Sequence, residues 1–424
     1  MRLRTETDKL GLYLSFPFCR SKCTYCNFAS GVFPASEHER YLNRLIEDIE
    51  RSGKWAGEPG VELPRTVDTI YLGGGTPSLL EPHLVQRLFR TIRDVFDVEA
   101  DAEITMECAP GQLPDATLDG MRASGVNRVS LGVQSFIDRE AQTSGRLHRR
   151  ADVLQDLERL CAAGITNLNV DLIAGLAGQT LASWDESLAV LIDSDVPHAS
   201  LYMLEVDEDS RLGRELLAGG HRYYADVVPS EDSVARMYER GIERLTEAGL
   251  LQYEISNFAR PGAASRHNLR YWQRRPYLGV GLDASSALFA MADSEQPNDA
   301  LMQRKLLRSK TTEDLNAYLT QAEPPEMEWL SVAKQFEEAW FLGLRLNRGV
   351  QLSSLRSEFG AERVSGVLET LARQSALGLL LNDGENISLT PRGRLLSNEV
   401  FQGFLSDPLA DAAVASAIRP DASR

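Results

Sequence analysis

The sequence contains few cysteines, and their number and spacing restrict its class. Only 5 of the 424 residues are cysteine, and Cys19, Cys23 and Cys26 fall within one short stretch. An odd number of cysteines crowded in this way does not fit the disulfide framework of a secreted protein. The cysteine content therefore favours a reducing compartment, and we expect the protein to be cytoplasmic.

The sequence also lacks long apolar runs and an excess of basic residues. The N-terminal stretch MRLRTETDKLGLYLSFPF is interrupted by charges, and no later segment approaches the roughly 18 apolar residues of a membrane span. The formal net charge of −16 disfavours broad binding to nucleic acid phosphates. With 43% hydrophobic residues the chain can bury a large core, and its length predicts two domains. We expect neither export nor membrane insertion.

Short β-type runs alternate with helical patterns over the first half of the chain. The β-type runs are 12–16, 69–72, 103–108, 126–134, 167–175 and 198–204, and the helical patterns are 39–51, 81–96, 113–125, 150–164 and 180–194. This alternation predicts an α/β fold with a parallel sheet, either open and doubly wound or closed into a barrel. In a barrel, ligands lie at the carboxyl ends of the strands.

The last part of the chain has a different pattern. A helical segment is expected around residues 330 to 345, followed by two helices at 352–360 and 363–374 and a hairpin at 377–393 that turns at Asp383-Gly384. This is the order of a winged helix. Residues 331–405 hold eight basic and eight acidic side chains, so the basic surface of a DNA-binding domain is missing. We expect a packing or partner-binding module.

The stretch FCRSKCTYCNF places its three cysteines directly after a predicted strand. A structural zinc site needs four ligands, and neither Cys108 nor Cys161 has a partner at the spacing of a zinc finger. Three unrelated thiols are the other alternative. An iron–sulfur cube held by three thiolates keeps one iron open. Such an iron can hold S-adenosylmethionine and pass an electron to its sulfonium, which breaks a C–S bond and gives a deoxyadenosyl radical. We favour this interpretation.

Other polar and glycine-rich positions also follow predicted strands. Three glycines, 73–75, come straight after the second strand, where the lack of Cβ allows close approach to a ligand. Glu107, Gln134 and Asp171 are expected at the ends of the next three strands. Each alone is an ordinary strand-end residue. Together with Arg146 they predict a ring that binds an ammonium group, a ribose diol and a carboxylate.

With these motifs, the sequence resembles the radical S-adenosylmethionine proteins of the oxygen-independent coproporphyrinogen oxidase group. The resemblance rests on FCRSKCTYCNF, YLGGGTPS, GVNRVSLGVQSF, NLNVDLIAGLAGQT, YEISNFA and HNLRYW. It implies a partial (β/α)6 barrel with a smaller C-terminal winged-helix-like domain. It also implies that Cys19, Cys23 and Cys26 ligate a [4Fe-4S] cluster, and that S-adenosylmethionine is bound by Tyr13, Tyr25, Gly74, Gly75, Thr76, Glu107, Gln134, Arg146 and Asp171.

Two features place the sequence nearer the heme-chaperone branch of this group. The oxidases carry a further cysteine two positions after the third, where this chain has Phe28. The chaperone branch has an H-N-x-x-Y-W segment implicated in holding heme, matched here by His267, Asn268, Tyr271 and Trp272. From the residues alone, His267 fits either a hydrogen-bonded turn residue or an axial ligand of heme iron.

The resemblance therefore implies a chaperone that binds heme as cargo and uses the cluster and S-adenosylmethionine to transfer it to an acceptor protein. Oxidation of coproporphyrinogen III, or another radical reaction on a porphyrin, is the alternative. The implied partners are heme, the acceptor and an electron donor such as flavodoxin or ferredoxin, without nucleic acid. A membrane contact through the acceptor and a homodimer are compatible with this assignment. The expected domains are a barrel core at 1–240, a connecting and heme-binding segment at 241–325, and the C-terminal domain at 326–424.

Overall fold

The computed structural model describes residues 9–291, 305–321 and 324–405. The chain forms two compact units. Of the described residues, the first unit comprises 9–271, 275–291, 307–321 and 324–329, and the second comprises 272–274, 305–306 and 330–405. Within the described ranges, no helix has both the length and the apolar composition needed to cross a bilayer.

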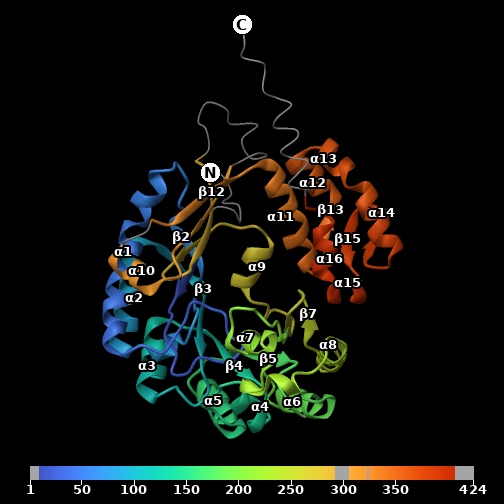
Figure 1. Ribbon diagram of the computed structural model, residues 1–424. Coiled ribbons are helices and arrows are strands. Elements are labelled where there is room, and N and C mark those ends of the chain that lie inside the picture. The colour runs from blue at the N-terminus through green and yellow to red at the C-terminus, as the bar shows by residue number, and fades with distance from the viewer. Residues whose placement is uncertain (1–8, 292–304, 322–323, 406–424) are drawn as a thin grey trace. The chain divides into compact units, whose positions relative to one another are not determined.

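The centre of the first unit is a parallel sheet. Strands β1 to β6 lie side by side in sequence order, each parallel to the next. The connecting helices lie around the outside of these strands (Figure 1). The strands are β1 (Leu10–Ser15), β2 (Thr66–Gly73), β3 (Asp97–Cys108), β4 (Arg128–Gln134), β5 (Asn167–Ala174) and β6 (His198–Met203), and the helices are α1 (Ser36–Gly57), α2 (Pro82–Val95), α3 (Asp115–Ser124), α4 (Asp138–Thr143), α5 (Arg150–Ala162) and α6 (Leu181–Asp193). The predicted α/β alternation is confirmed.

Further strands extend this sheet at both edges. β9 pairs in parallel with β1, and β8 pairs antiparallel with β6. The order is β12-β11-β10-β9-β1-β2-β3-β4-β5-β6-β8-β7, which is linear, so the described strands form an open, partial (β/α)6 barrel. The added strands are β7 (Leu251–Gln252), β8 (Asn257–Ala259), β9 (Tyr277–Val280), β10 (Ser285–Phe289), β11 (Leu306–Lys310) and β12 (Glu326–Leu330). All of these strands except β12 belong to the segment 241–325. This segment, which was expected to connect the barrel core to the C-terminal domain, therefore also contributes strands to the sheet.

The two faces of the sheet differ in polarity because side chains alternate along a strand. In β1, Leu10, Leu12 and Leu14 are buried and join one hydrophobic cluster with Leu42 and Leu45 of α1. The opposite face is mostly polar. The side chains on it include Tyr13 and Ser15 of β1, Thr69 and Tyr71 of β2, Glu103, Thr105 and Glu107 of β3, and Arg128, Ser130 and Gln134 of β4. A polar inner face is where a site for polar ligands can form.

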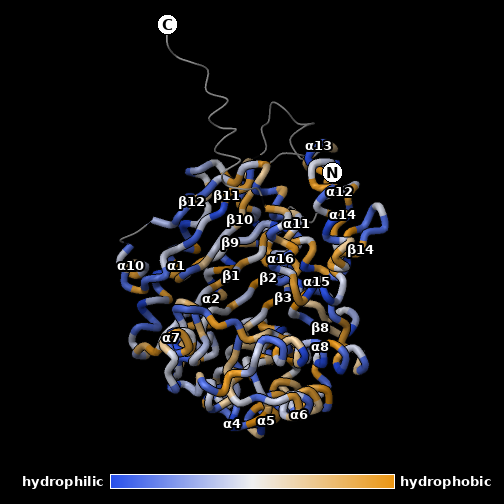
Figure 2. The backbone as a smooth tube through the Cα atoms, turned by 45° about the vertical axis from the view of Figure 1, so that its right-hand side comes forward, coloured by the Kyte–Doolittle hydropathy of each residue, from blue (hydrophilic) through white to orange (hydrophobic). Residues whose placement is uncertain are grey.

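The outer helices are amphipathic, as their patterns predicted. In α2 the buried residues recur every three or four positions, which gives one apolar face, and Pro82 stands at the first turn, where its missing N–H costs nothing. Orange and blue alternate along α5 and α6 in the same way (Figure 2). Further α-helices are α7 (Arg211–Leu217), α8 (Glu231–Glu247), α9 (Arg266–Trp272) and α10 (Leu315–Thr320), which belong to the first unit except for Trp272, the last residue of α9.

The second unit contains short helices and a small antiparallel sheet. The strand order is β13-β15-β14, and β14 and β15 form the predicted hairpin, with Gly384 at positive φ. The elements are α11 (Val332–Arg345), β13 (Val350–Gln351), α12 (Leu352–Phe359), α13 (Ala361–Gly366), α14 (Leu368–Ala376), β14 (Leu380–Asn382), β15 (Asn386–Leu389), α15 (Pro391–Leu395) and α16 (Ser397–Gln402). The winged-helix order is confirmed, but the second predicted helix is divided at Val367.

Candidate functional site

The three clustered cysteines lie in the loop that follows β1. Their thiols are free and partly exposed. The Thr76 hydroxyl donates to Cys19 Sγ at 3.8 Å, and Cys26 Sγ lies 3.9 Å from Ser30 Oγ. Burial raises the pKa of Cys19, and the charges of Cys23 and Cys26 raise it further. The three thiols therefore share one local environment. In the described ranges, no three His, Cys, Asp or Glu side chains stand close enough to hold a single metal ion.

The glycine-rich turn after β2 lies against the backbone of this loop. Thr76 N donates to Phe18 O at 2.8 Å, and Phe16 N donates to Gly73 O at 2.8 Å. A Cβ on Gly75 would lie only 2.5 Å from Phe16 O, a contact that a real side chain does not make. Glycine is therefore required there by the close approach of two backbones.

Glu107 lies on the inner face near the end of β3, beside this turn. Its Oε1 accepts a hydrogen bond from Tyr71 Oη at 2.8 Å, and the Tyr71 ring stacks on Tyr13 with centroids 6.2 Å apart. Burial raises the pKa of Glu107 to about 7. The negative charge of Asp171 raises it as well, whereas Tyr71, the Gly74 N–H and Arg146 stabilise the ionised form. Glu107 is thus poised to change charge when a ligand approaches.

Gln134 and Arg146 each present a polar atom without a hydrogen-bond partner in the described part of the chain. A Cβ on Gly132 would lie 2.9 Å from Arg146 Nη2 and 3.2 Å from Gln134 Nε2, so both groups pass over this glycine. Among the described residues, neither Gln134 Oε1 nor Arg146 Nε has a hydrogen-bond partner, although both atoms are buried. Gln134 also has a φ of 69°, in the left-handed region that non-glycine residues rarely occupy. Strain and unsatisfied polar atoms at one place are typical of a ligand site.

The prediction that Asp171 ends its strand is wrong. β5 continues to Ala174, because residues 172–174 pair with β6. The Asp171 carboxylate accepts hydrogen bonds from Ser130 Oγ at 3.0 Å and Asn169 Nδ2 at 2.7 Å. Burial raises its pKa, and its charge acts on both Glu107 and Arg146. Asp171 therefore lies with Glu107, Gln134 and Arg146, and these four residues are called the polar group below. Asp171 is the one placed further from the strand end on the inner face.

Tyr25 joins the cysteine loop to this polar group. Its hydroxyl accepts a hydrogen bond from Arg146 Nη2 at 3.4 Å, and burial raises its pKa. The loop is also tied to α4 and α7, since Thr24 N donates to Ser144 O and Leu212 N donates to Thr24 O, at 3.0 and 2.9 Å. The predicted cysteine and S-adenosylmethionine residues are thus brought together by loops after β1 and β2 and by the inner faces of β3 to β5.

His267 is buried in the first unit and both of its ring nitrogens are engaged. Nδ1 lies 2.9 Å from Thr69 Oγ1, and Nε2 lies 2.8 Å from Tyr271 Oη. The Glu103 carboxylate accepts the backbone N–H groups of Arg266 and His267, each at 3.0 Å, and so caps the start of α9. Burial lowers the pKa of His267 to about 3. His267 is a neutral, hydrogen-bonded residue that attaches α9 to the strands.

The other residues of the H-N-x-x-Y-W segment differ in their surroundings. Asn268 is partly buried, and its backbone N–H donates to Ser265 Oγ at 3.3 Å. Trp272 belongs to the second unit, where the guanidinium of Arg345 lies 4.2 Å from its ring centroid. Sequence reasoning missed Arg270, which is fully buried and forms an ion pair with Asp68. Asp68 and Arg270 are 202 positions apart in the chain, so no local sequence pattern could have indicated that they form a pair.

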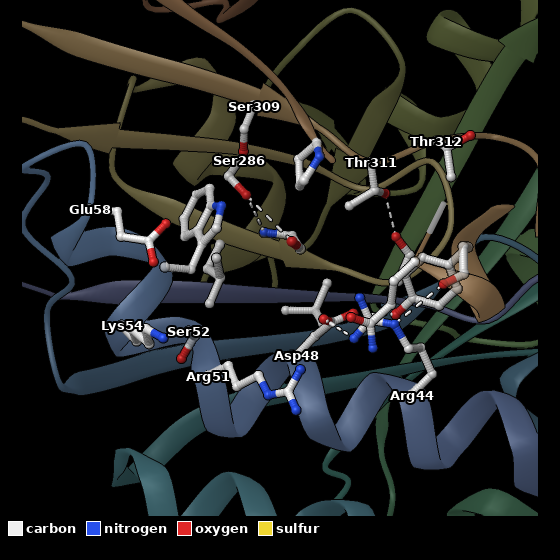
Figure 3. A pocket seen from close by; sticks show the side chains of 18 residues that line it. Arg44, Asp48, Arg51, Ser52, Lys54, Glu58, Ser286, Ser309, Thr311 and Thr312 are labelled. Carbon is white, nitrogen blue, oxygen red and sulfur yellow. Dashed lines mark hydrogen bonds and ion pairs between the residues drawn. The ribbon is translucent and has the colours of Figure 1, made fainter. Parts of the chain in front are cut away.

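A separate cavity of about 390 Å³ lies between α1 and strands β9 to β11. Figure 3 shows Arg44, Asp48 and Arg51 on α1 with Ser286, Ser309 and Thr311 on the opposite side. The lining residues include no cysteine or histidine and none of the predicted site residues. The cavity is therefore distinct from the group around the cysteine loop.

Comparison with known proteins identifies the family. Residues 13–191 match the radical SAM superfamily, and residues 330–396 match the HemN C-terminal domain. The chain is 34% identical over 403 residues to the heme chaperone HemW of Lactococcus lactis, covering 94% of this chain and 97% of that protein. It is 31% identical over 402 residues to the heme chaperone HemW of Bacillus subtilis, covering 93% and 99%.

A solved structure supports the same assignment at the level of the fold. The coproporphyrinogen III oxidase HemN of Escherichia coli, described as a radical SAM enzyme, superposes with a TM-score of 0.77 at 23% identity, covering 95% of this chain and 91% of that one. The likeness extends over both described units. With near-complete coverage by relatives above 30% identity, the chain belongs to the HemW family of radical SAM proteins.

Proposed function

We propose that this protein is a heme chaperone, which binds heme and transfers it to an acceptor protein with the help of a [4Fe-4S] cluster and S-adenosylmethionine. The cargo is supported by the relatives, two of which are heme chaperones that match almost the whole chain. The cofactors are supported by the polar group around the cysteine loop. An electron donor such as flavodoxin or ferredoxin belongs to the same proposal.

The donor set of the loop suits a cluster with one open iron. Cys19, Cys23 and Cys26 would supply three thiolates, and the Thr76 hydroxyl lies close enough to Cys19 Sγ to stabilise its charge. Of the other two cysteines, Cys108 is buried on the helix side of β3 and Cys161 is exposed on α5. A bound cluster supplies an electron to the sulfonium of S-adenosylmethionine.

The observation that carries the cofactor proposal is the pair of unsatisfied atoms, Gln134 Oε1 and Arg146 Nε. Buried polar atoms of this kind are costly unless a ligand or water completes them. Arg146 would bind the carboxylate of S-adenosylmethionine, Glu107 its amino group, and Gln134 and Asp171 its ribose hydroxyls. Gly74, Gly75 and Thr76 would contact the methionine part, with Tyr13 and Tyr25 at either side.

Tyr71→Phe is expected to weaken binding of S-adenosylmethionine and to shift its pH dependence. In this proposal the ionised Glu107 accepts a hydrogen bond from the amino group of S-adenosylmethionine. The affinity of the wild type for S-adenosylmethionine should therefore rise as the pH rises through the Glu107 pKa of about 7. Tyr71 stabilises that ionised form, and its removal raises the pKa further. Because a hydrogen bond to a charged group contributes about 1.5–3 kcal/mol, affinity at pH 7 should fall roughly ten- to a hundredfold.

Equilibrium dialysis of S-adenosylmethionine across a pH series measures this effect without relying on turnover. The phenylalanine ring keeps the stacking on Tyr13, so the variant changes only the hydroxyl. The two proteins should converge at high pH, where Glu107 is ionised in both. Equal affinity at every pH would mean that Glu107 does not contact the ligand.

Heme binding and porphyrin chemistry can be compared in one sample to test the overall function. Anaerobically reconstituted protein should bind hemin in equimolar amount, release it to apomyoglobin added as a heme acceptor, and leave coproporphyrinogen III unchanged in the presence of reductant and S-adenosylmethionine. Consumption of coproporphyrinogen without hemin binding would instead identify an oxidase. That result would also show that Phe28, in place of a further cysteine, does not prevent the reaction.

A further inference from the structure

Given the heme-chaperone function proposed above, the residue that ligates the heme iron can be sought among the histidines. Imidazole is a common axial ligand of heme. The chain contains 6 histidines, and all of them lie in the described ranges. A suitable imidazole must be neutral, must have a free and reachable nitrogen, and must lie beside apolar surface that can cover a porphyrin face.

Three of the histidines are buried and engaged. His267 has both ring nitrogens in hydrogen bonds, as described above. Both ring nitrogens of His198 are also hydrogen-bonded, with Nδ1 2.6 Å from Asn169 Oδ1 and Nε2 2.9 Å from Tyr253 Oη. His148 has Nε2 3.1 Å from Val133 O, and its Nδ1 has no hydrogen-bond partner among the described residues, but the side chain is buried and so out of reach. None of the three can reach heme without opening the first unit.

Two further histidines are exposed but lack a suitable environment. The side chains of His83 and His221 are 67% and 84% exposed, and each lies beside a carboxylate, Glu81 or Asp226, at 3.3 or 3.6 Å. Within the described part of the chain, ring contacts of histidine involve only His38, His198 and His267. His83 and His221 therefore have no aromatic side chain at hand for the face of a porphyrin.

His38 meets all the conditions. It lies in the first turn of α1, and its imidazole packs on the Phe18 ring with centroids 4.3 Å apart. In the described ranges neither ring nitrogen has a hydrogen-bond partner, and the side chain is partly exposed. Burial lowers the pKa of His38, against the charge of Glu81, which raises it, and the net lowering favours the neutral imidazole that binds iron.

The loop beside His38 supplies apolar surface. Phe28 and Val32 are 63% and 62% exposed, which is unusual for large apolar side chains of a well-packed unit. Phe33 meets the Phe18 ring edge-on, with centroids 5.9 Å apart. Gly31 pairs with the cysteine loop, donating to Pro17 O and accepting from Cys19 N, each at 2.8 Å. The exposed apolar side chains are thus carried by a segment that lies directly against Phe18 and Cys19.

We propose that His38 is the axial ligand of the cargo heme, and that the apolar segment 28–33 covers one face of the porphyrin. Phe18, which contacts His38, directly precedes Cys19. Heme held in this way lies next to the cluster loop, so the redox state of the cluster and the retention of heme can influence one another.

Hemin titration of the full-length, cluster-loaded protein tests the assignment. The wild type should show the electronic absorption spectrum and the electron paramagnetic resonance spectrum of an imidazole-ligated heme. His38→Ala should lose that ligation and bind hemin roughly tenfold or more weakly. His221→Ala, which removes a more exposed imidazole, is the matched control and should behave as the wild type. Free imidazole added to His38→Gly should restore the wild-type spectrum.

Different outcomes separate this assignment from the proposed function. If the wild type binds no hemin, the chaperone function itself is wrong. If the wild type binds hemin but His38→Ala has the same spectrum and Kd, the function stands and His38 is not the ligand. Iron and sulfide contents of His38→Ala equal to the wild type show that the cysteine loop is intact, so that a weaker heme site reflects the missing imidazole.

Discussion

Cys23→Ala is expected to abolish the iron–sulfur cluster. The variant, reconstituted anaerobically with iron and sulfide, should retain no stoichiometric cluster, whereas the wild type should bind one per chain. With only Cys19 and Cys26 left, two irons of the cube lack a protein thiolate. Cys108 is fully buried and Cys161 belongs to α5, so neither offers a replacement without a large rearrangement.

Iron and acid-labile sulfide per chain, together with the visible absorption spectrum, measure this outcome. Cys161→Ala is the matched control, because it removes an exposed thiol outside the loop and should keep the full complement. A Cys23→Ala protein that still binds four irons and four sulfides would contradict the three-thiolate assignment. The thermal unfolding of the cluster-free proteins should be alike, since Cys23 is only partly buried.

Much of the first unit could be predicted from the sequence because its periodicity is local. The six inner strands and their helices follow from short β-type runs and amphipathic patterns, and the pairing of β1 to β6 confirms their order. Asp171 was misplaced at the strand end although the predicted β-type run 167–175 already extends beyond it, and the pairing of Leu172–Ala174 with β6 shows that the strand continues. The edge strands β7 and β8 are two and three residues long, too short to give a pattern.

The site shows the same division between local and long-range information. The cysteines and glycines were found because they are close in sequence and follow strands. Tyr71 could have been found, since it precedes Gly73 by two residues and so lies on the same face of β2. The partners of His267 could not have been predicted from the sequence, because Thr69 and Glu103 are 198 and 164 positions away in the chain. A histidine in a motif therefore gave no indication of whether its nitrogens were free.

Asp68→Ala is expected to lower the free energy of unfolding of the first unit by about 3–5 kcal/mol. Asp68 forms ion pairs with Arg270 and Arg275, and the Arg270 side chain is fully buried. Burial lowers the pKa of Arg270 to about 10, so the guanidinium stays charged at pH 7. Without Asp68, its remaining acceptors are the carbonyls of Lys9 and Pro276 and the Thr69 hydroxyl, which leave a buried charge uncompensated.

The expected loss can be measured by urea unfolding followed by circular dichroism, with Asp101→Ala as the control. Asp101 also faces an arginine of α9, Arg266, but at 3.9 Å and with 84% of its side chain exposed. An exposed pair of this kind contributes about 0–1 kcal/mol, so the control should unfold near the wild-type midpoint. If Asp68→Ala and Asp101→Ala both lower the free energy of unfolding only slightly and to the same extent, the buried Asp68–Arg270 pair does not hold α9 in place.

The Asp68→Ala variant also decides how a heme-binding defect in His267→Ala is interpreted. His267 and Arg270 both attach α9 to β2, through Thr69 and Asp68. If His267 acts only by holding α9, Asp68→Ala and His267→Ala should weaken heme binding in proportion to the stability each loses, with the heme spectrum unchanged. If His267 is the axial ligand, His267→Ala alone should change the spectrum. Because both of its nitrogens are occupied by hydrogen bonds, we expect the first result.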